Sequence, residues 1–138
     1  MTQPIDIHKA AGILIQDKKL LVTRTRGKQF FIAPGGRVER GETVTEALVR
    51  ELSEELGIQV SESDIAEFGT FSAPAVGAEN KQLQMDVFLV EKWNGDIQPA
   101  AEVEEIKWID SHDVETITLG SIFKHDVFPR LVEQRLIH

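Results

Sequence analysis

The sequence predicts an α/β fold in which a mixed β-sheet is sandwiched between α-helices. Segments with strand-like composition lie before and after one segment of helical period, and the tail returns to helical spacing. Single prolines and glycines separate these segments, and we find no repeat or linker. With 138 residues the chain has room for one moderate core, so we expect a single domain over residues 1–138.

The first elements are predicted to be short strands. Residues 9–15 and 20–25 are rich in aliphatic side chains, and the polar run 17–19 joins them into a predicted hairpin. Residues 30–33 form another short strand. We expect the Pro-Gly-Gly run at 34–36 to stop it, because proline lacks an amide donor and glycine permits positive φ.

A helix is predicted next. Thr43 is suited to cap its start, and Gly57 is a good C-terminal stop. Apolar residues recur with helical spacing between these two positions, and the stripe consists of Val44, Leu48, Leu52 and Leu56.

The second half of the chain is predicted as strands followed by a helix. The strands cover residues 65–76, 83–93 and 105–109, with a polar loop at 77–82 and a tight turn at 94–95. Apolar residues at roughly helical spacing predict the closing helix over 122–137, although Pro129 leaves its start open.

Composition and charge exclude several classes of protein. Lys and Arg total 15 against 23 Asp and Glu, and the net charge of −8 disfavours binding to a nucleic acid polymer. The absence of cysteine excludes disulfides, thiolate catalysis and cysteine-ligated metals. Neither a membrane-spanning apolar run nor a secretory signal is recognisable, so we expect a cytoplasmic protein that does not enter membranes.

One face of the predicted helix carries three acids, Glu51, Glu54 and Glu55. At about 100° per residue, they fall within roughly 100° of one another, and Glu55 borders the apolar stripe. Like charges at this spacing repel, and the C-terminal half of a helix favours cations. A hard divalent cation would resolve both conflicts, because carboxylates on one face can converge on Mg²⁺. Taken alone, a solvated acidic face is the alternative interpretation.

Arg50 lies next to these acids in sequence but about 100° from Glu51 on the helix. It is expected to support the acids from their flank by pairing with Glu42 or Glu46. An ordinary exposed ion pair is the alternative.

The intervals around this helix form a specific motif. Five residues separate Gly36 from Glu42, seven more lead to the Arg-Glu-Leu at 50–52, and the Glu-Glu at 54–55 and Gly-Ile at 57–58 follow. This pattern resembles, at every specified position, the box that defines the Nudix hydrolase family, and the order of strands and helices elsewhere is also similar. The sequence is therefore identified as a member of that family, with its mixed sheet between helices.

The resemblance implies metal-dependent hydrolysis of a nucleoside diphosphate linked to another moiety. In the family, Mg²⁺ or Mn²⁺ is bound by residues matching Glu51, Glu54 and Glu55, often with a carbonyl oxygen matching Gly36. The residue matching Glu42 is usually structural and tied to the one matching Arg50. The short chain favours a nucleoside triphosphate or an oxidised nucleotide, cleaved to the monophosphate. Because many relatives pair, a homodimer is one form to be expected.

The resemblance leaves the general base open. In several relatives a glutamate shortly before a later strand and tryptophan is catalytic or binds metal, and Glu102 is closest to that position here. Glu105 is the runner-up, and a glutamate of the box is a further candidate. Solvated loop acids are the alternative interpretation.

Substrate recognition is less specified. Arg24, Arg26 and Lys28 precede the box, where cations could bind phosphates, or they are ordinary edge-strand charges. A base could stack on an apolar surface formed by Phe30, Phe31, Phe71 and Met85, although aromatic residues at strand spacing are more often core.

Other features argue against specific roles. His8 and His112 have no metal-ligand spacing, and we assign them no catalytic role. The chain lacks tyrosine, and Pro74 does not securely supply the additional signature of ADP-ribose hydrolases. A catalytically silent nucleotide-binding module of the same fold is the alternative function, although it would be free to lose one of the three box acids.

Overall fold

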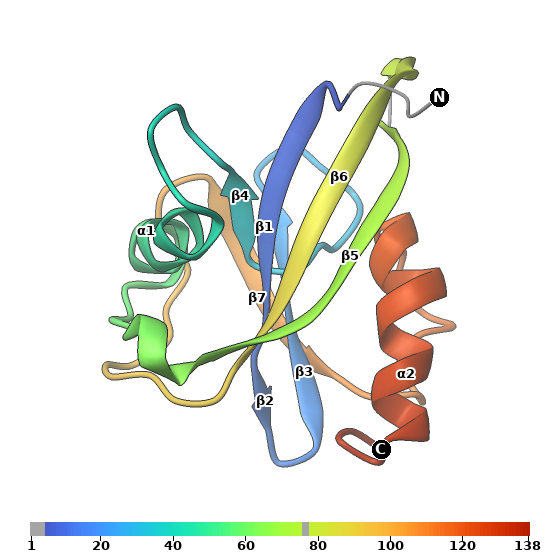
Figure 1. Cartoon of the computed structure of the whole chain (residues 1–138). Helices are drawn as coiled ribbons and strands as arrows, with labels where there is room; N and C mark the ends of the chain where they lie inside the picture. Colours follow the sequence, from blue (N-terminus) through green and yellow to red (C-terminus); the bar gives the residue numbers. More distant parts are fainter. Residues whose placement is uncertain (1–4, 76–77) are drawn as a thin grey trace.

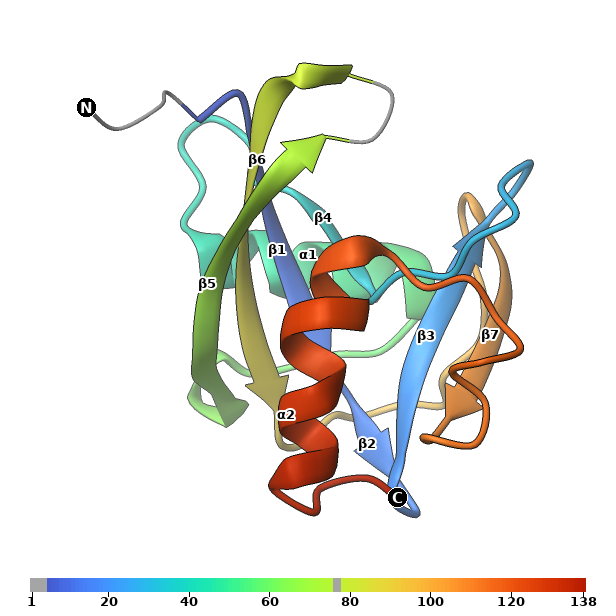
Figure 2. The same cartoon turned by 90° about the vertical axis from the view of Figure 1, so that its right-hand side faces the viewer.

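The computed structural model describes residues 5–75 and 78–138, and its strands form two sheets that lie between two helices (Figure 1). Helix α1 (Val44–Leu56) covers one side of the strands and α2 (Phe128–Glu133) the other, which the perpendicular view in Figure 2 also shows. The predicted α/β fold, with a mixed sheet between helices, is therefore confirmed. Among the described residues, every helix is too short or too polar to span a lipid bilayer.

The first sheet is mixed and has the order β4-β1-β6-β5. Strand β1 (Ile7–Ile13) pairs in parallel with β6 (Ala78–Val90) and antiparallel with β4 (Gly35–Arg37), while β6 pairs antiparallel with β5 (Ile65–Ala75). The prediction that the glycines after Pro34 end a strand was wrong, because they begin β4 instead. Gly35 has φ of 141°, and a Cβ there would lie 2.1 Å from the carbonyl oxygen of Ala10. Only glycine permits this close pairing.

The second sheet has the order β2-β3-β7. Strands β2 (Ile15–Gln16) and β3 (Lys19–Thr25) form a hairpin whose turn residues, Asp17 and Lys18, have positive φ, and β3 also pairs with β7 (Val103–Ile109). The turn was predicted correctly, but the strand predicted over residues 9–15 is divided at Leu14 between the two sheets.

Two predicted strand boundaries also differ from the structure. Residues 30–33 form only isolated bridges, Thr23 with Ile32 and Phe31 with Leu119. The loop predicted at 77–82 is largely strand, because β6 starts at residue 78 and ends at 90, before the predicted 93. The pairs Pro74 with Gln82 and Ala75 with Ala78 continue the β5/β6 ribbon into the predicted loop. Val76 and Gly77, assigned to a strand and a loop, lie outside the described residues.

Helix α1 begins and ends where its sequence predicts. The Thr43 side chain accepts a hydrogen bond from the Glu46 amide, the Glu46 side chain accepts one from the Thr43 amide, and Gly57 is left-handed with φ of 69°. A short 3-10 turn, η1 (Glu62–Asp64), follows before β5. The apolar stripe packs into a core with β1, β3 and β6, whose largest members include Leu14, Leu21, Leu48, Leu52, Leu56 and Phe88.

The closing helix is preceded by a π-helical turn, η2 (Phe123–Val127), so helical structure runs through Pro129 without a break. Pro129 has no amide to donate into this segment, and it stands directly after the π-helical turn, at the start of α2. The observed helical segment, residues 121–133, is shorter than the predicted 122–137, because Arg135 adopts positive φ. Its apolar face closes the second core against the other side of the sheets.

Candidate active site

Helix α1 brings two acids to the site because its buried stripe fixes its orientation. Leu52 and Leu56 are fully buried. Glu55, at the border of this stripe as the helical wheel predicts, is only 4% exposed and accepts a 2.8 Å hydrogen bond from the Gly35 amide. The first residue of β4 thereby holds the carboxylate of Glu55 at the inner edge of the site.

A third acid reaches the same point from the loop before β7. One carboxylate oxygen of each of Glu51, Glu55 and Glu102 lies within 4.8 Å of the other two. The Glu102 backbone is held by a 2.8 Å hydrogen bond from the Arg26 amide to its carbonyl oxygen. The structure thus brings together two of the three box acids and the loop acid. Glu54 lies outside this group, with a side chain that is 53% exposed.

Burial makes this cluster electrostatically costly. It raises the pKa of Glu55 to about 8, with additional repulsion from Glu51 and Glu102, while the hydrogen bond from Gly35 opposes the shift. Burial also raises the pKa of Glu51, although the Arg50 guanidinium opposes it. Three ionised carboxylates at this spacing therefore need a nearby positive charge.

Gly36 leaves the space in which Glu51 lies. A Cβ at this position would be 2.5 Å from the carboxyl carbon of Glu51. A Cβ essentially never lies this close to a carbon to which it is not bonded, so any larger residue would displace the carboxylate. The glycine of the motif is thus explained by close approach of backbone to side chain and not by positive φ.

Arg50 connects the cluster to the loop before the helix. Its guanidinium donates two hydrogen bonds to Glu42, at 2.7 and 3.0 Å, and one of 3.1 Å to the Arg37 carbonyl. Hydrogen bonding to Arg50 lowers the pKa of Glu42 to about 2. Of the two expected partners, Arg50 pairs with Glu42, because Glu46 is engaged in the helix cap.

Arg50 also reaches two of the box acids, which the helical wheel did not predict. Its Nη1 lies 2.9 Å from an oxygen of Glu51 and 3.4 Å from one of Glu54. The arginine side chain is long enough to bend around the helix towards neighbouring positions. The positive charge of Arg50 therefore partly neutralises the acidic face of its own helix.

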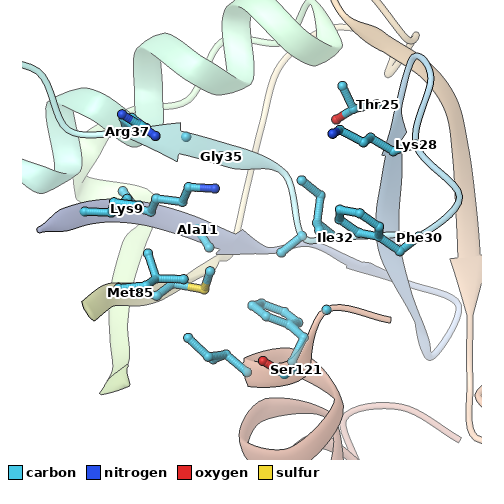
Figure 3. Close-up of a pocket in the computed structure, with 18 of the residues that line it drawn as sticks. Lys9, Ala11, Thr25, Lys28, Phe30, Ile32, Gly35, Arg37, Met85 and Ser121 are labelled. Atoms are coloured by element: carbon cyan, nitrogen blue, oxygen red, sulfur yellow. The ribbon is translucent and has the colours of Figure 1, made fainter. Parts of the chain in front are cut away.

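A pocket of about 490 Å³ adjoins the cluster at Gly35 and Gly36 (Figure 3). Lys9 and Arg37 lie at one side of it, and Thr25 and Lys28 lie at another. Strands β1, β4, β5 and β6, the end of β3 with the loop after it, and the start of the closing helix supply the walls. The residues that line the pocket are Ile7, Lys9, Ala10, Ala11, Thr25, Lys28, Phe30, Ile32, Ala33, Gly35, Gly36, Arg37, Pro74, Leu83, Met85, Gly120, Ser121, Ile122 and Phe123.

Comparison with known proteins supports the same family. The family model described as NUDIX domain matches residues 6–131. The 8-oxo-dGTP diphosphatase of Buchnera aphidicola subsp. Schizaphis graminum is 31% identical over 83% of this chain and 85% of its own. The chain belongs to the Nudix domain family.

The chain is also similar to a second relative in sequence and to a solved structure. An ADP-ribose pyrophosphatase of Methanocaldococcus jannaschii is 30% identical over 75% of this chain and 61% of its own length. The solution structure of the E. coli ORF135 protein superposes on this one with a TM-score of 0.74 and 26% sequence identity. The match covers 94% of this chain and 92% of the ORF135 chain.

Among the predicted phosphate-binding cations of this Nudix domain, only Lys28 lines the pocket. Arg24 pairs instead with Glu105 at 3.0 Å and with Glu104 at 3.3 Å, so it links β3 to β7. Arg26 is exposed and is not among the described residues that line the pocket. Glu105, the runner-up for general base, is therefore engaged by Arg24, whereas Glu102 joins the cluster.

Two cations of the pocket, Lys9 and Arg37, were missed in the sequence. Lys9 falls in a predicted strand. Because successive side chains of a strand point to opposite faces, Lys9 could have been placed on the face opposite to that of His8. Burial lowers the pKa of Lys9, and the nearby Arg37 lowers it further. Arg37 directly follows the glycines of the box, but its direction depends on β4, which was not predicted.

Only some of the residues considered for base stacking line the pocket, and neither of the two histidines considered does. Phe30 and Met85 line the pocket. Phe31 is buried in the core, and the Phe71 ring packs under the guanidinium of Arg130 at 5.2 Å. The two histidines are hydrogen-bonded to acids outside the pocket: His8 to Asp86 and His112 to Asp110.

Proposed function

We propose that this protein hydrolyses a pyrophosphate bond of a nucleoside diphosphate derivative, with a nucleoside triphosphate, ordinary or oxidised, as the favoured substrate. The products would be the monophosphate and pyrophosphate. The observation that carries this proposal is the convergence of Glu51, Glu55 and Glu102 beside a pocket lined with cations. The names of the relatives, which include 8-oxo-dGTP diphosphatases and an ADP-ribose pyrophosphatase, support a small nucleotide as substrate.

The donor atoms in the cluster suit a hard divalent cation. They are carboxylate oxygens, which Mg²⁺ and Mn²⁺ prefer, and burial makes the charge of Glu55 costly unless a cation lies beside it. We propose that Mg²⁺ is held by Glu51, Glu55 and Glu102, with the Gly36 carbonyl and Glu54 as further ligands. When bound, the metal neutralises charge on the phosphates and lowers the pKa of water.

The protein's own groups would position the reactants. Glu102 comes from a loop and not from the helix, and we propose that it either completes the metal site or accepts the proton of the attacking water. Arg50, anchored by Glu42, would hold Glu51 in place. Lys9, Arg37 and Lys28 would contact phosphate oxygens that face the pocket, since phosphate groups favour cationic partners.

The test is a substrate screen with Mg²⁺ that identifies both products by mass. The panel contains nucleoside triphosphates, nucleotide sugars, ADP-ribose and dinucleoside polyphosphates. We expect triphosphates to yield monophosphate and pyrophosphate, and EDTA to abolish the reaction. If Mg²⁺ and a nucleotide bind by calorimetry while none of the panel is cleaved, the protein is a silent nucleotide-binding module and the proposal is wrong.

A further inference from the structure

The pocket beside the acid cluster bears on which nucleotides the protein accepts. Its volume of about 490 Å³ lies in the usual range of small-molecule sites, roughly 300–1,000 Å³. It begins at Gly35 and Gly36, next to the proposed metal site, and extends to Ser121 at the start of the closing helix. A nucleoside whose phosphates lie at the cluster would therefore occupy this space.

The side chains of the pocket provide charge but few groups that could distinguish bases. Every charged side chain among its described lining residues is a cation, namely Lys9, Lys28 or Arg37. The same set contains no aspartate, glutamate, asparagine or glutamine, and its uncharged polar side chains are Thr25 and Ser121. Carboxylates, amides and arginine are the side chains that pair with two adjacent positions on a base edge. The described lining contains only Arg37 of these, and the proposed function places Arg37 on the phosphates.

Part of the backbone around the pocket is already used within the fold. Ile32 and Thr23 exchange hydrogen bonds of 2.7 and 2.8 Å between their backbone groups. The Phe31 amide donates to the Thr118 carbonyl, and the Gly120 amide donates to the Phe31 carbonyl at 2.9 Å. The amides of Phe31, Ile32 and Gly120 are consequently not free to donate to the edge of a base.

The remaining contacts in the pocket are apolar. Phe30 is partly exposed and lines the pocket, so its ring can stack on any base, since every base has an aromatic face. A site built on paired hydrogen bonds rejects a wrong substrate by about 10⁴–10⁵, whereas apolar contact discriminates by only about 10–200-fold.

We propose that the pocket selects a triphosphate by charge and apolar contact, and accepts several bases in place of a single oxidised purine. This inference rests on the proposed function for its site, but it concerns selectivity and can be tested separately from cleavage.

The experiment compares kcat/KM for dATP, dGTP, 8-oxo-dGTP, dCTP and dTTP with Mg²⁺. We expect the values to fall within about 100-fold of one another. A preference of about 10⁴ for one base would overturn the inference.

A parallel calorimetric titration uses non-hydrolysable α,β-methylene analogues of the same five nucleotides with Mg²⁺. Similar Kd values without cleavage of any triphosphate would refute the proposed function but support the selectivity inference. A Kd more than about 1,000-fold lower for one base, or no binding of any analogue, would refute the inference itself.

Variants identify the source of the affinity. Phe30→Ala should weaken all five analogues by a similar factor, about 5- to 100-fold, and Phe30→Leu by less, because leucine keeps apolar contact without stacking. Ser121→Ala and Thr25→Val should leave the ratios between bases within about 3-fold. A ratio that changes about 100-fold in either hydroxyl variant would show hydrogen-bonded readout and contradict the proposal. Thermal melting confirms that each variant is folded.

Discussion

Replacing Glu55 with glutamine should stabilise the metal-free protein while destroying its metal site. Glu55 is 4% exposed, and burial raises its pKa to about 8 from an ordinary value of 4.5. Glutamine has nearly the same shape, its oxygen can still accept the hydrogen bond from Gly35, and it carries no charge at any pH. Its amide can also donate to the facing carboxylates of Glu51 and Glu102.

The size of the effect follows from the two pKa values of Glu55. Because the folded-state pKa is above the unfolded value, the proton that Glu55 retains stabilises the fold fully below pH 4.5, and this contribution is lost as the pH rises through about 8. At about 1.4 kcal/mol per pH unit above 4.5, the loss is on the order of 3 kcal/mol at pH 7 and 5 kcal/mol above pH 8. Glutamine does not ionise, so the Glu55→Gln variant avoids this loss of stability.

The assay is thermal and urea unfolding from pH 4.5 to 8.5 in EDTA, for the parent protein, Glu55→Gln and Glu54→Gln. At pH 7 we expect Glu55→Gln to melt roughly 10 °C higher than the parent, and near pH 4.5 to match it. Glu54→Gln is the control, because its exposed site predicts a change within about 0.5 kcal/mol. Adding Mg²⁺ in place of EDTA should raise the melting temperature of the parent protein but should leave that of Glu55→Gln unchanged. A Glu55→Gln protein that is less stable than the parent at pH 8 would refute the reasoning.

Three further predictions concern activity and metal affinity. Glu54→Gln should lower kcat by orders of magnitude in a steady-state assay, and unchanged turnover would remove Glu54 from the site. Glu102→Gln should reduce kcat at least 10-fold, whereas the control Glu115→Gln, which alters an exposed acid outside the cluster, should change it less than 3-fold; equal effects would argue against Glu102. Gly36→Ala should weaken Mg²⁺ binding at least 10-fold by calorimetry, because its Cβ displaces the Glu51 carboxylate, and normal affinity would contradict that contact.

Helix α1 could be predicted because its determinants are local. The Thr43 cap, the Gly57 stop and the apolar stripe all act within one turn or between neighbouring turns. The positions of Glu51 and Glu55 follow from that stripe, since the direction of a helical side chain is set by its place on the wheel.

The pocket could not be predicted in the same way, because its walls depend on pairing between distant segments. Strand β4 is only three residues long and exists because its glycines pack against β1, so Arg37 had no predicted direction. Lys9 lies in a predicted strand, but the sequence does not show which other segments meet its face of that strand to form the pocket. Non-local pairing of this kind leaves little trace in a sequence period.

The outcome for Arg24 shows how a predicted substrate contact can become structural support. Its guanidinium pairs with Glu104 and Glu105, so it links β3 to the first residues of β7. The adjacent backbone is fixed by the Arg26 amide, which donates to the carbonyl of Glu102. Glu102 is exposed and belongs to a loop, and it would otherwise be free to turn away from its charged neighbours. We therefore expect Arg24 to affect the reaction only indirectly, because its ion pairs fix the start of β7 directly after Glu102.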